Sequence, residues 1–188
     1  MQERGLAGDS IFICLITGWG SALAGAGEQG KVTRFFGDFS LRPVAREDLP
    51  TLMKIESQVS PFPWTAKQFS DSIKGHQGVV LVKSDEIVSY LFFYRILDQA
   101  ELLNIAVAPD FQGRGLGSRL LKYCLDQLRE YTEHLHLEVR ASNFPAIALY
   151  LRNGFRQVGE RRDYYRDGEK REDALLMVFD FHETGSLV

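Results

Sequence analysis

Residues 109–130, PDFQGRGLGSRLLKYCLDQLRE, decide the fold because they join a glycine-rich loop to an amphipathic helix. The glycines at 113, 115 and 117 let the backbone curl so that successive N–H groups point at one spot, and the helix N-terminus adds a partial positive charge there. The residues that follow form one apolar stripe at helical spacing: Leu116, Leu120, Leu121, Cys124, Leu125 and Leu128. The stretch predicts a phosphate-binding site at the start of a packed helix. The alternative is a strand-to-helix turn that merely contains glycine.

The spacing of these glycines excludes two nucleotide-binding motifs. A P-loop requires GxxxxGK[ST], which the sequence lacks. A dinucleotide fingerprint requires GxGxxG within a βαβ unit, but here the third glycine follows after a single residue. The strand before the loop also belongs to a predicted antiparallel meander, which is not how a dinucleotide-binding unit begins. The glycine motif alone therefore does not indicate which phosphate-containing ligand the loop binds.

The segments around the loop predict an α+β fold with a mixed sheet. Turn residues separate three strand-like runs before the loop, and Pro109 ends the last of them because proline cannot continue a ladder. A strand that follows the amphipathic helix is expected to run parallel to the strand before it. The predicted strands are 39–44, 78–83, 87–97, 101–108, 134–140, 155–165 and 173–180. The predicted helices are 46–59, a short one capped by Thr65, the one after the glycine loop, and 143–153.

Composition limits the classes of function. The chain has 188 residues with 45% hydrophobic and 25% charged residues, which is ordinary for a single globular domain. The net charge of -3 and the short basic clusters argue against a general nucleic-acid binder. Neither the two cysteines nor the four histidines have metal-ligand spacing, so no metal is expected. A monomer in the reducing cytoplasm is the simplest expectation.

Residues 1–38 are expected to be an extension to a domain that spans 39–188. Residues 11–27, IFICLITGWGSALAGAG, are apolar but too short and glycine-broken for a membrane helix. An Ala-x-Ala triplet at 22–24 is typical of signal peptides, yet residues 1–10, MQERGLAGDS, are not positively charged. A poorly ordered extension or a misassigned start codon is favoured over a weak signal peptide.

Three separated segments resemble the GNAT N-acetyltransferases. The pattern Val107-x-Pro109-x-x-Gln112-x-x-Gly115-x-Gly117 resembles their acetyl-CoA motif. Residues 137–155, LEVRASNFPAIALYLRNGF, and 161–177, RRDYYRDGEKREDALLM, are similar to the bacterial ribosomal-protein-alanine N-acetyltransferases, and FPW at 62–64 also fits. The resemblance spans 39–180 and implies a GNAT fold, with about six or seven strands and about four helices. It also implies acetyl-CoA as co-substrate. One departure is Phe144-Pro145, which stands where small residues are usual.

The resemblance assigns two catalytic roles. Glu138 falls on the general base, and Tyr150 falls on the acid that protonates the leaving thiolate. From the residues alone, Glu138 lies on the polar face of an alternating strand and could be only an exposed carboxylate. Tyr150 could be only a core aromatic. A binding-only module would have no need of such a pair.

The resemblance also implies the residues that hold the cofactor and the acceptor. Backbone amides of the loop are expected to bind the pyrophosphate, and a strand N–H is expected to stabilise the oxyanion. The expected cofactor-binding residues are Ile105, Ala106, Val107, Gln112, Gly113, Arg114, Gly115, Leu116, Gly117, Ser118 and Asn143. The expected acceptor-binding residues are Phe62, Trp64, Glu101, Tyr164 and Tyr165. The expected partner is the N-terminal alanine of ribosomal protein S18 or a similar N-terminus, with no membrane. Lysine side chains, small amines and a non-catalytic role remain alternatives.

Overall fold

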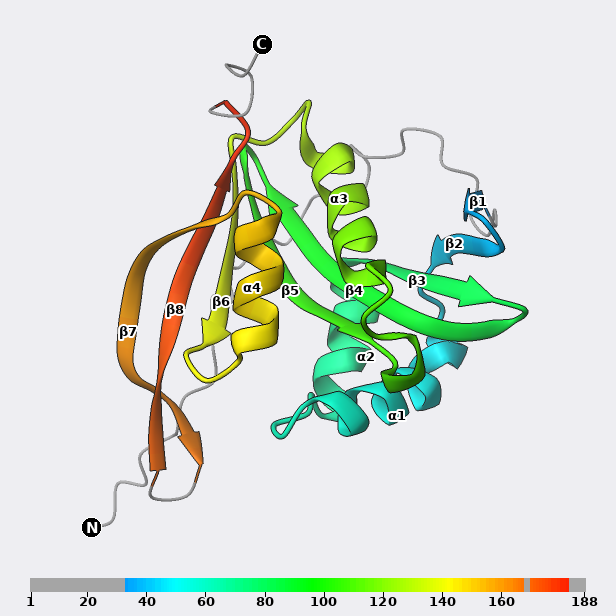
Figure 1. Ribbon diagram of the computed structural model, residues 1–188, viewed down its shortest axis with the longest axis horizontal. Coiled ribbons are helices and arrows are strands. Elements are labelled where there is room, and N and C mark those ends of the chain that lie inside the picture. Colours follow the sequence, from blue (N-terminus) through cyan, green and yellow to red (C-terminus); the bar gives the residue numbers. More distant parts are fainter. Residues whose placement is uncertain (1–32, 168–169, 183–188) are drawn as a thin grey trace.

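Eight strands form one mixed sheet in the computed structural model, which describes residues 33–167 and 170–182. The order across the sheet is β1-β2-β3-β4-β5-β6-β8-β7 (Figure 1). The strands are β1 (Thr33–Phe36), β2 (Phe39–Pro43), β3 (Gln77–Lys83), β4 (Glu86–Ile96), β5 (Gln99–Val107), β6 (His134–Arg140), β7 (Arg156–Asp167) and β8 (Lys170–Asp180). All neighbouring pairs are antiparallel except β5 and β6, which are parallel as predicted.

Helices cover both faces of the sheet. The helices are α1 (Leu49–Val59), α2 (Ala66–Gly75), α3 (Leu116–Leu128) and α4 (Phe144–Arg152). Helices α3 and α4 lie on the near face in Figure 1, and α1 and α2 lie behind the sheet. Each face has its own core, because alternate strand residues pack against different helices. The whole apolar stripe predicted for α3 is buried on the near face.

The sheet opens between β5 and β6, the fifth and sixth strands in its order. Strands β5 and β6 pair only at their first residues, and the last pair is Glu101 with His136. Beyond this point β5 continues to Val107 and β6 to Arg140 without pairing to each other. The two strands diverge visibly toward the bottom of Figure 1. The opening exposes strand backbone in the middle of the sheet, where a ligand can approach it.

The N-terminal boundary and the first helix differ from the sequence prediction. Strand β1 lies within the segment expected to be an extension, and it pairs with β2, so the sheet begins six residues earlier and has one strand more than the predicted upper number. Residues 1–32 lie outside the described part of the chain. The helix predicted at 46–59 is divided into a 3-10 turn, Arg46–Asp48, and α1. Pro50 occupies the first turn of α1, where its missing N–H costs no hydrogen bond, and this favours a new start there.

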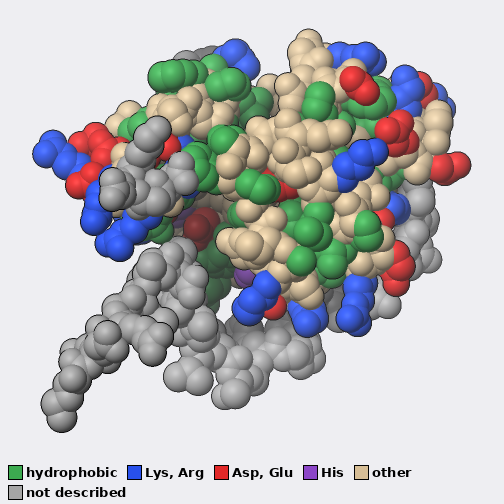
Figure 2. Space-filling model, turned by 90° about the horizontal axis from the view of Figure 1, so that it is seen from below, with side chains coloured by type: hydrophobic (Ala, Val, Ile, Leu, Met, Phe, Trp, Pro, Cys, Tyr) green, Lys and Arg blue, Asp and Glu red, His purple; other side chains and the backbone are tan. Residues whose placement is uncertain are grey.

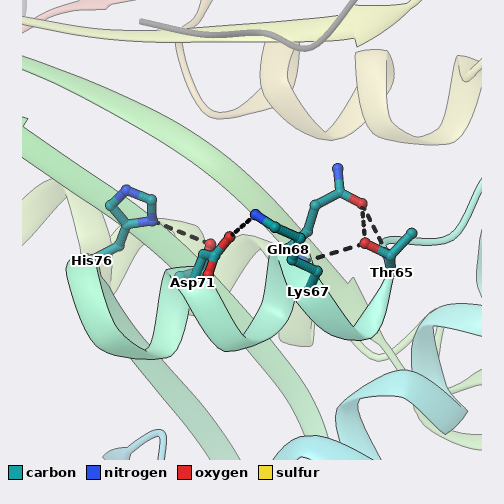
Figure 3. Close-up of polar contacts among 6 residues, drawn as sticks. Thr65, Lys67, Gln68, Asp71 and His76 are labelled. Atoms are coloured by element: carbon teal, nitrogen blue, oxygen red, sulfur yellow. Dashed lines mark hydrogen bonds and ion pairs between the residues drawn. The ribbon is translucent and has the colours of Figure 1, made fainter. Parts of the chain in front are cut away.

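Thr65 caps α2 as predicted, and the cap gives a test of local stability. Its hydroxyl accepts from the Gln68 N–H at 3.3 Å, and the Gln68 side chain accepts from the Thr65 N–H at 2.9 Å (Figure 3). Thr65→Ala is expected to lower the free energy of unfolding by about 1 kcal/mol, measured by urea denaturation. Lys67→Ala in the same helix removes an exposed ion pair to Asp71 and is expected to change stability much less. Equal losses in the two variants would contradict the role of the cap.

Candidate active site

The glycine loop presents free backbone donors at the start of α3. Gly113 and Gly115 have φ values of 72° and 75°, in the left-handed region that side chains disfavour. Gly115 is the N-cap residue of α3, and no side chain caps this helix. The first N–H groups of α3 therefore lack an intrahelical partner and a side-chain partner, and they face the region where the helix dipole is positive. This geometry suits a pyrophosphate.

Three side chains fix the shape of this loop. The Gln112 amide donates to the Val107 carbonyl at 3.0 Å, and Arg114 donates to the Asp110 carbonyl at 2.8 Å. Asn153, at the end of α4, donates to the Ser118 hydroxyl at 3.1 Å. Arg114 thus adds positive charge beside the loop while it is already bonded to the turn before it.

Gly115 allows a direct test of the loop conformation. A Cβ at this position would meet nothing within 4 Å, so Gly115→Ala would suffer only from its positive φ. The substitution is expected to lower the free energy of unfolding by about 1–2 kcal/mol and to weaken acetyl-CoA binding. Chemical denaturation and calorimetric titration would measure the two effects. Gly75→Ala is the matched control, because Gly75 also has open space but no positive φ. Unchanged acetyl-CoA affinity in Gly115→Ala would contradict the proposed binding of the pyrophosphate by this loop.

Strand β5 directs backbone groups into the opening of the sheet. The Ala108 N–H donates to the Val88 carbonyl at 2.8 Å, which sets the alternation of the antiparallel ladder with β4. The N–H and C=O of Ala106 therefore point to β4, and those of Ile105 and Val107 point toward β6. The Val107 carbonyl is taken by Gln112. The N–H groups of Ile105 and Val107 remain as candidate donors to a thioester oxygen.

Glu138 lies on β6 beside the opening. Its side chain is 23% exposed, and its Oε1 lies 2.8 Å from Nη1 of Arg161 on β7. The neighbouring residues Leu137 and Val139 are buried in the core beneath α3 and α4, so Glu138 points to the opposite face. The carboxylate is therefore within reach of solvent and is neutralised by a cation that is itself half exposed.

Tyr150 lies on α4 and is 7% exposed, in the near-face core. Its ring packs against Phe155, with centroids 5.7 Å apart. Burial, and to a lesser extent the neighbouring Tyr165, raises the pKa of Tyr150 well above its usual value. No hydrogen bond to its hydroxyl is found among the described residues. The hydroxyl therefore keeps its proton at neutral pH and can donate it to a ligand.

Tyr165 of β7 is an electrostatic neighbour of both candidate catalytic residues. Burial raises the pKa of Tyr165 to about 12, and the charge of Glu138 adds to this rise. Tyr165 in turn contributes to the raised pKa of Tyr150. Glu138 points to one face of β6, and Tyr150, on α4, packs on the other face. The opening between β5 and β6 is the route by which one reactant could contact both.

The two aromatics predicted in the loop between α1 and α2 lie in different surroundings. Phe62 stacks on the guanidinium of Arg140 at 3.6 Å. The ring of Trp64 instead packs against Phe69 and Phe92 in the far-face core, at centroid distances of 5.3 and 6.0 Å. Only Phe62 is thus placed as a wall of the opening.

Buried Glu56 anchors the backbone of this loop. Its carboxylate accepts from the Trp64 N–H at 3.2 Å, from the Asn104 amide at 3.4 Å, and from the Tyr90 hydroxyl. Asn104 belongs to β5, so the network ties the loop to the strand that borders the opening. Sequence reasoning did not single out Glu56, because a lone acid on a helix has no motif.

Glu101 lies where the opening begins. Its carboxylate accepts from the Tyr94 hydroxyl at 2.6 Å. It lines a shallow pocket of about 240 Å³ together with Tyr94, Ile96, Gln99, Ala100 and His136. Seen from below, the molecule is hollowed between its two halves, and acidic and histidine side chains are recessed in the hollow (Figure 2). Negative charge in a hollow of this kind favours a cationic acceptor.

Asn143 and Tyr164 complete the predicted residues. Asn143 caps α4, since its Oδ1 accepts from the Ala146 N–H at 3.2 Å. Within the described residues, no hydrogen bond of its amide nitrogen is found. Tyr164 packs edge-on against Tyr165 and lies under Arg161, whose guanidinium is 5.2 Å from the ring centroid. Arg161 and Arg140, like Glu56, were not singled out from the sequence, although the RRDYY and LEVR segments that carry the two arginines were part of the resemblance.

Comparison with known proteins shows the family to which the chain belongs. Residues 48–155 match the acetyltransferase (GNAT) family, which is more than half of the chain. The chain therefore belongs to this family, and the predicted fold and the predicted class of enzyme are confirmed.

Two bacterial relatives and two solved structures are among the proteins similar to this chain. The ribosomal protein bS18-alanine N-acetyltransferase of Salmonella typhimurium is 43% identical over 137 residues, covering 70% of this chain and 90% of that enzyme. The enzyme of the same name from Escherichia coli K12 is 41% identical over 133 residues, with the same shares. The crystal structure of the Escherichia coli S18-alanine enzyme has a TM-score of 0.70 at 36% identity, covering 76% of this chain and 94% of that one. An Arabidopsis thaliana protein crystallised with acetyl-CoA shares the fold, with a TM-score of 0.70 at 20% identity over 77% of this chain and 99% of that one.

The described part of the chain contains no helix long and apolar enough to cross a membrane. Within the same residues, no three His, Cys, Asp or Glu side chains are grouped as metal ligands.

Proposed function

We propose that this protein transfers acetyl from acetyl-CoA to the N-terminal amine of a protein, with the N-terminal alanine of ribosomal protein bS18 as the acceptor. The observation that carries the proposal is the similarity to two bS18-alanine N-acetyltransferases over 90% of their length. The open sheet, the uncapped α3 and the acidic hollow are in keeping with it.

In the proposed reaction, the pyrophosphate binds the first N–H groups of α3, and the thioester enters the opening beside β5. An N–H of Ile105 or Val107 donates to the thioester oxygen and stabilises the negative charge that develops there. The neutral amine attacks the carbonyl carbon directly, and its nitrogen releases a second proton to solvent. The carbon–sulfur bond then breaks as the thiolate takes the proton of Tyr150, which solvent restores. Burial raises the pKa of the Cys124 thiol, so this cysteine stays neutral and unsuited to form an acyl-enzyme.

Glu138 takes a proton from the acceptor ammonium before attack. A terminal α-amino group has a pKa near 8, whereas a lysine amine is near 10.4, and the difference makes deprotonation of lysine costlier by roughly 3 kcal/mol. A carboxylate base is therefore better matched to an N-terminus. The Arg161 guanidinium leaves Glu138 as the ammonium arrives, so that one cation replaces another.

Tyr150 donates to the sulfur as the thiolate departs. Its raised pKa keeps the proton in place at neutral pH but makes complete transfer to a thiolate unfavourable until the tyrosine environment changes. In this proposal the Tyr150 hydroxyl first donates a hydrogen bond to the departing sulfur. It transfers its proton once negative charge has built up on the sulfur.

The decisive experiment compares acceptors. Purified protein is incubated with acetyl-CoA and peptides that begin with Ala, Ser or Met, or with an N-blocked lysine peptide, and the free thiol is followed. The Ala peptide with the bS18 sequence is expected to have the highest kcat/KM. Preference for the blocked lysine peptide would replace this proposal with side-chain acetylation on the same fold.

A further inference from the structure

Arg140 lies between two aromatic rings at the mouth of the opening. Its guanidinium carbon is 3.6 Å from the ring centroid of Phe62 and 4.0 Å from that of Tyr165. The side chain is 18% exposed, and its Nη1 donates to Glu172 at 3.0 Å. A planar cation held by two rings and one carboxylate has little freedom to move.

The three stacked groups come from three separate parts of the fold. Phe62 belongs to the loop between α1 and α2, Arg140 ends β6, and Tyr165 is on β7. Strand β6 and this loop are on opposite sides of the opening, because Glu56 ties the loop to Asn104 on β5. The stack therefore bridges the opening at the end where β5 and β6 are no longer paired.

We propose that Arg140 is a positioning residue for the acceptor: the stack Phe62–Arg140–Tyr165 closes the open end of the sheet and holds the wall against which the acceptor N-terminus lies. This inference rests on the proposed function. Tyr165 is also the electrostatic neighbour of Glu138 and Tyr150, so the stack fixes a ring next to both candidate catalytic groups.

Without the stack on Arg140, the side chain of Phe62 would not be held in this position. Its backbone N–H donates to the Ser60 hydroxyl at 3.1 Å, and the carboxylate of Glu56 holds the loop only at Trp64. The Arg140 guanidinium thus supplies the contact that fixes the side chain of Phe62. Loss of the stack is expected to loosen the acceptor wall while the glycine loop and α3 stay intact.

The test uses Arg140→Lys in the full-length protein. Lysine keeps the positive charge that can pair with Glu172 but loses the flat surface that stacks on two rings. The KM for the Ala peptide is expected to rise about tenfold, with kcat and the KM for acetyl-CoA nearly unchanged. Phe62→Leu is expected to have the same effect on the KM for the Ala peptide. In the double variant this KM should rise no further than in the more impaired of the two single variants.

Arg95→Lys is the matched control. Arg95 also stacks on an aromatic ring, that of Tyr131 at 5.3 Å, and also donates to backbone carbonyls, but it lies at the far end of β4. Its variant is expected to leave both KM values unchanged. An acceptor KM for Arg140→Lys within twofold of wild type, additive effects of the two substitutions, or an equal loss of acetyl-CoA binding would each overturn the proposal.

Hydrogen exchange separates this proposal from the proposed function. The amides of Phe62, Trp64 and Thr65 are expected to exchange faster in Arg140→Lys than in wild type, while those of α3 keep their protection. If the wild-type protein acetylates none of the N-terminal peptides, the proposed function fails, yet this measurement still decides whether Arg140 holds the loop. Unchanged exchange at the amides of Phe62, Trp64 and Thr65 would overturn the positioning role.

Discussion

Replacing Glu138 with glutamine is expected to lower the acetylation rate about 100-fold or more. The amide has nearly the shape of the carboxylate but cannot accept a proton from the acceptor ammonium. Acetyl-CoA binding should be retained, because its proposed contacts lie on the glycine loop and on β5 rather than on Glu138. Steady-state kinetics with the Ala peptide would measure the rate, and calorimetric titration would measure acetyl-CoA affinity.

The loss should also depend on pH in a defined direction. If Glu138 removes the proton, the variant should recover part of its activity as the pH rises toward and above 8, where a growing fraction of the acceptor amine is already neutral. Glu160→Gln is the control, because Glu160 is an exposed β7 carboxylate paired with Arg162 and not with the site. A Glu138→Gln rate within a fewfold of wild type would remove Glu138 from the mechanism.

Replacing Tyr150 with phenylalanine is expected to lower kcat by about 100-fold as well. The change removes one hydroxyl that makes no hydrogen bond among the described residues, so the protein should lose little stability. The aromatic packing against Phe155 should also be preserved. Departure of the thiolate would then proceed without a donor, and product formation should slow even at saturating acetyl-CoA.

The control for this substitution is Tyr123→Phe on α3. Tyr123 is also partly buried, and burial raises its pKa too, but its ring packs on Phe35 away from the opening. It is expected to leave kcat unchanged. If the leaving group is replaced by a thiol of lower pKa, the defect of Tyr150→Phe should shrink, because such a thiolate departs more easily without protonation. A defect that is independent of the leaving group would indicate that Tyr150 positions the cofactor instead.

Local signals in the sequence predicted most of the fold. The α3 stripe, the Thr65 cap and the parallel run of β6 after α3 each depend on residues close together in the chain, and the structure confirms all three. The glycine pattern also determined the left-handed turns that start α3. Strand β1 was missed, because a four-residue strand that pairs only with β2 among the described residues has no periodicity strong enough to stand out.

Only the tertiary structure decided how the site is assembled. Sequence alternation put Glu138 on the polar face of a strand, but the fold brings Arg161 to it from β7. The same is true of Arg140 and Phe62, which are far apart in the chain and meet across the opening. Such contacts arise from strand order and from the early end of β5–β6 pairing, and neither is encoded by local spacing. The sequence by itself determined which residues are candidates for the chemistry, and the early end of β5–β6 pairing decided which of them lie around one opening.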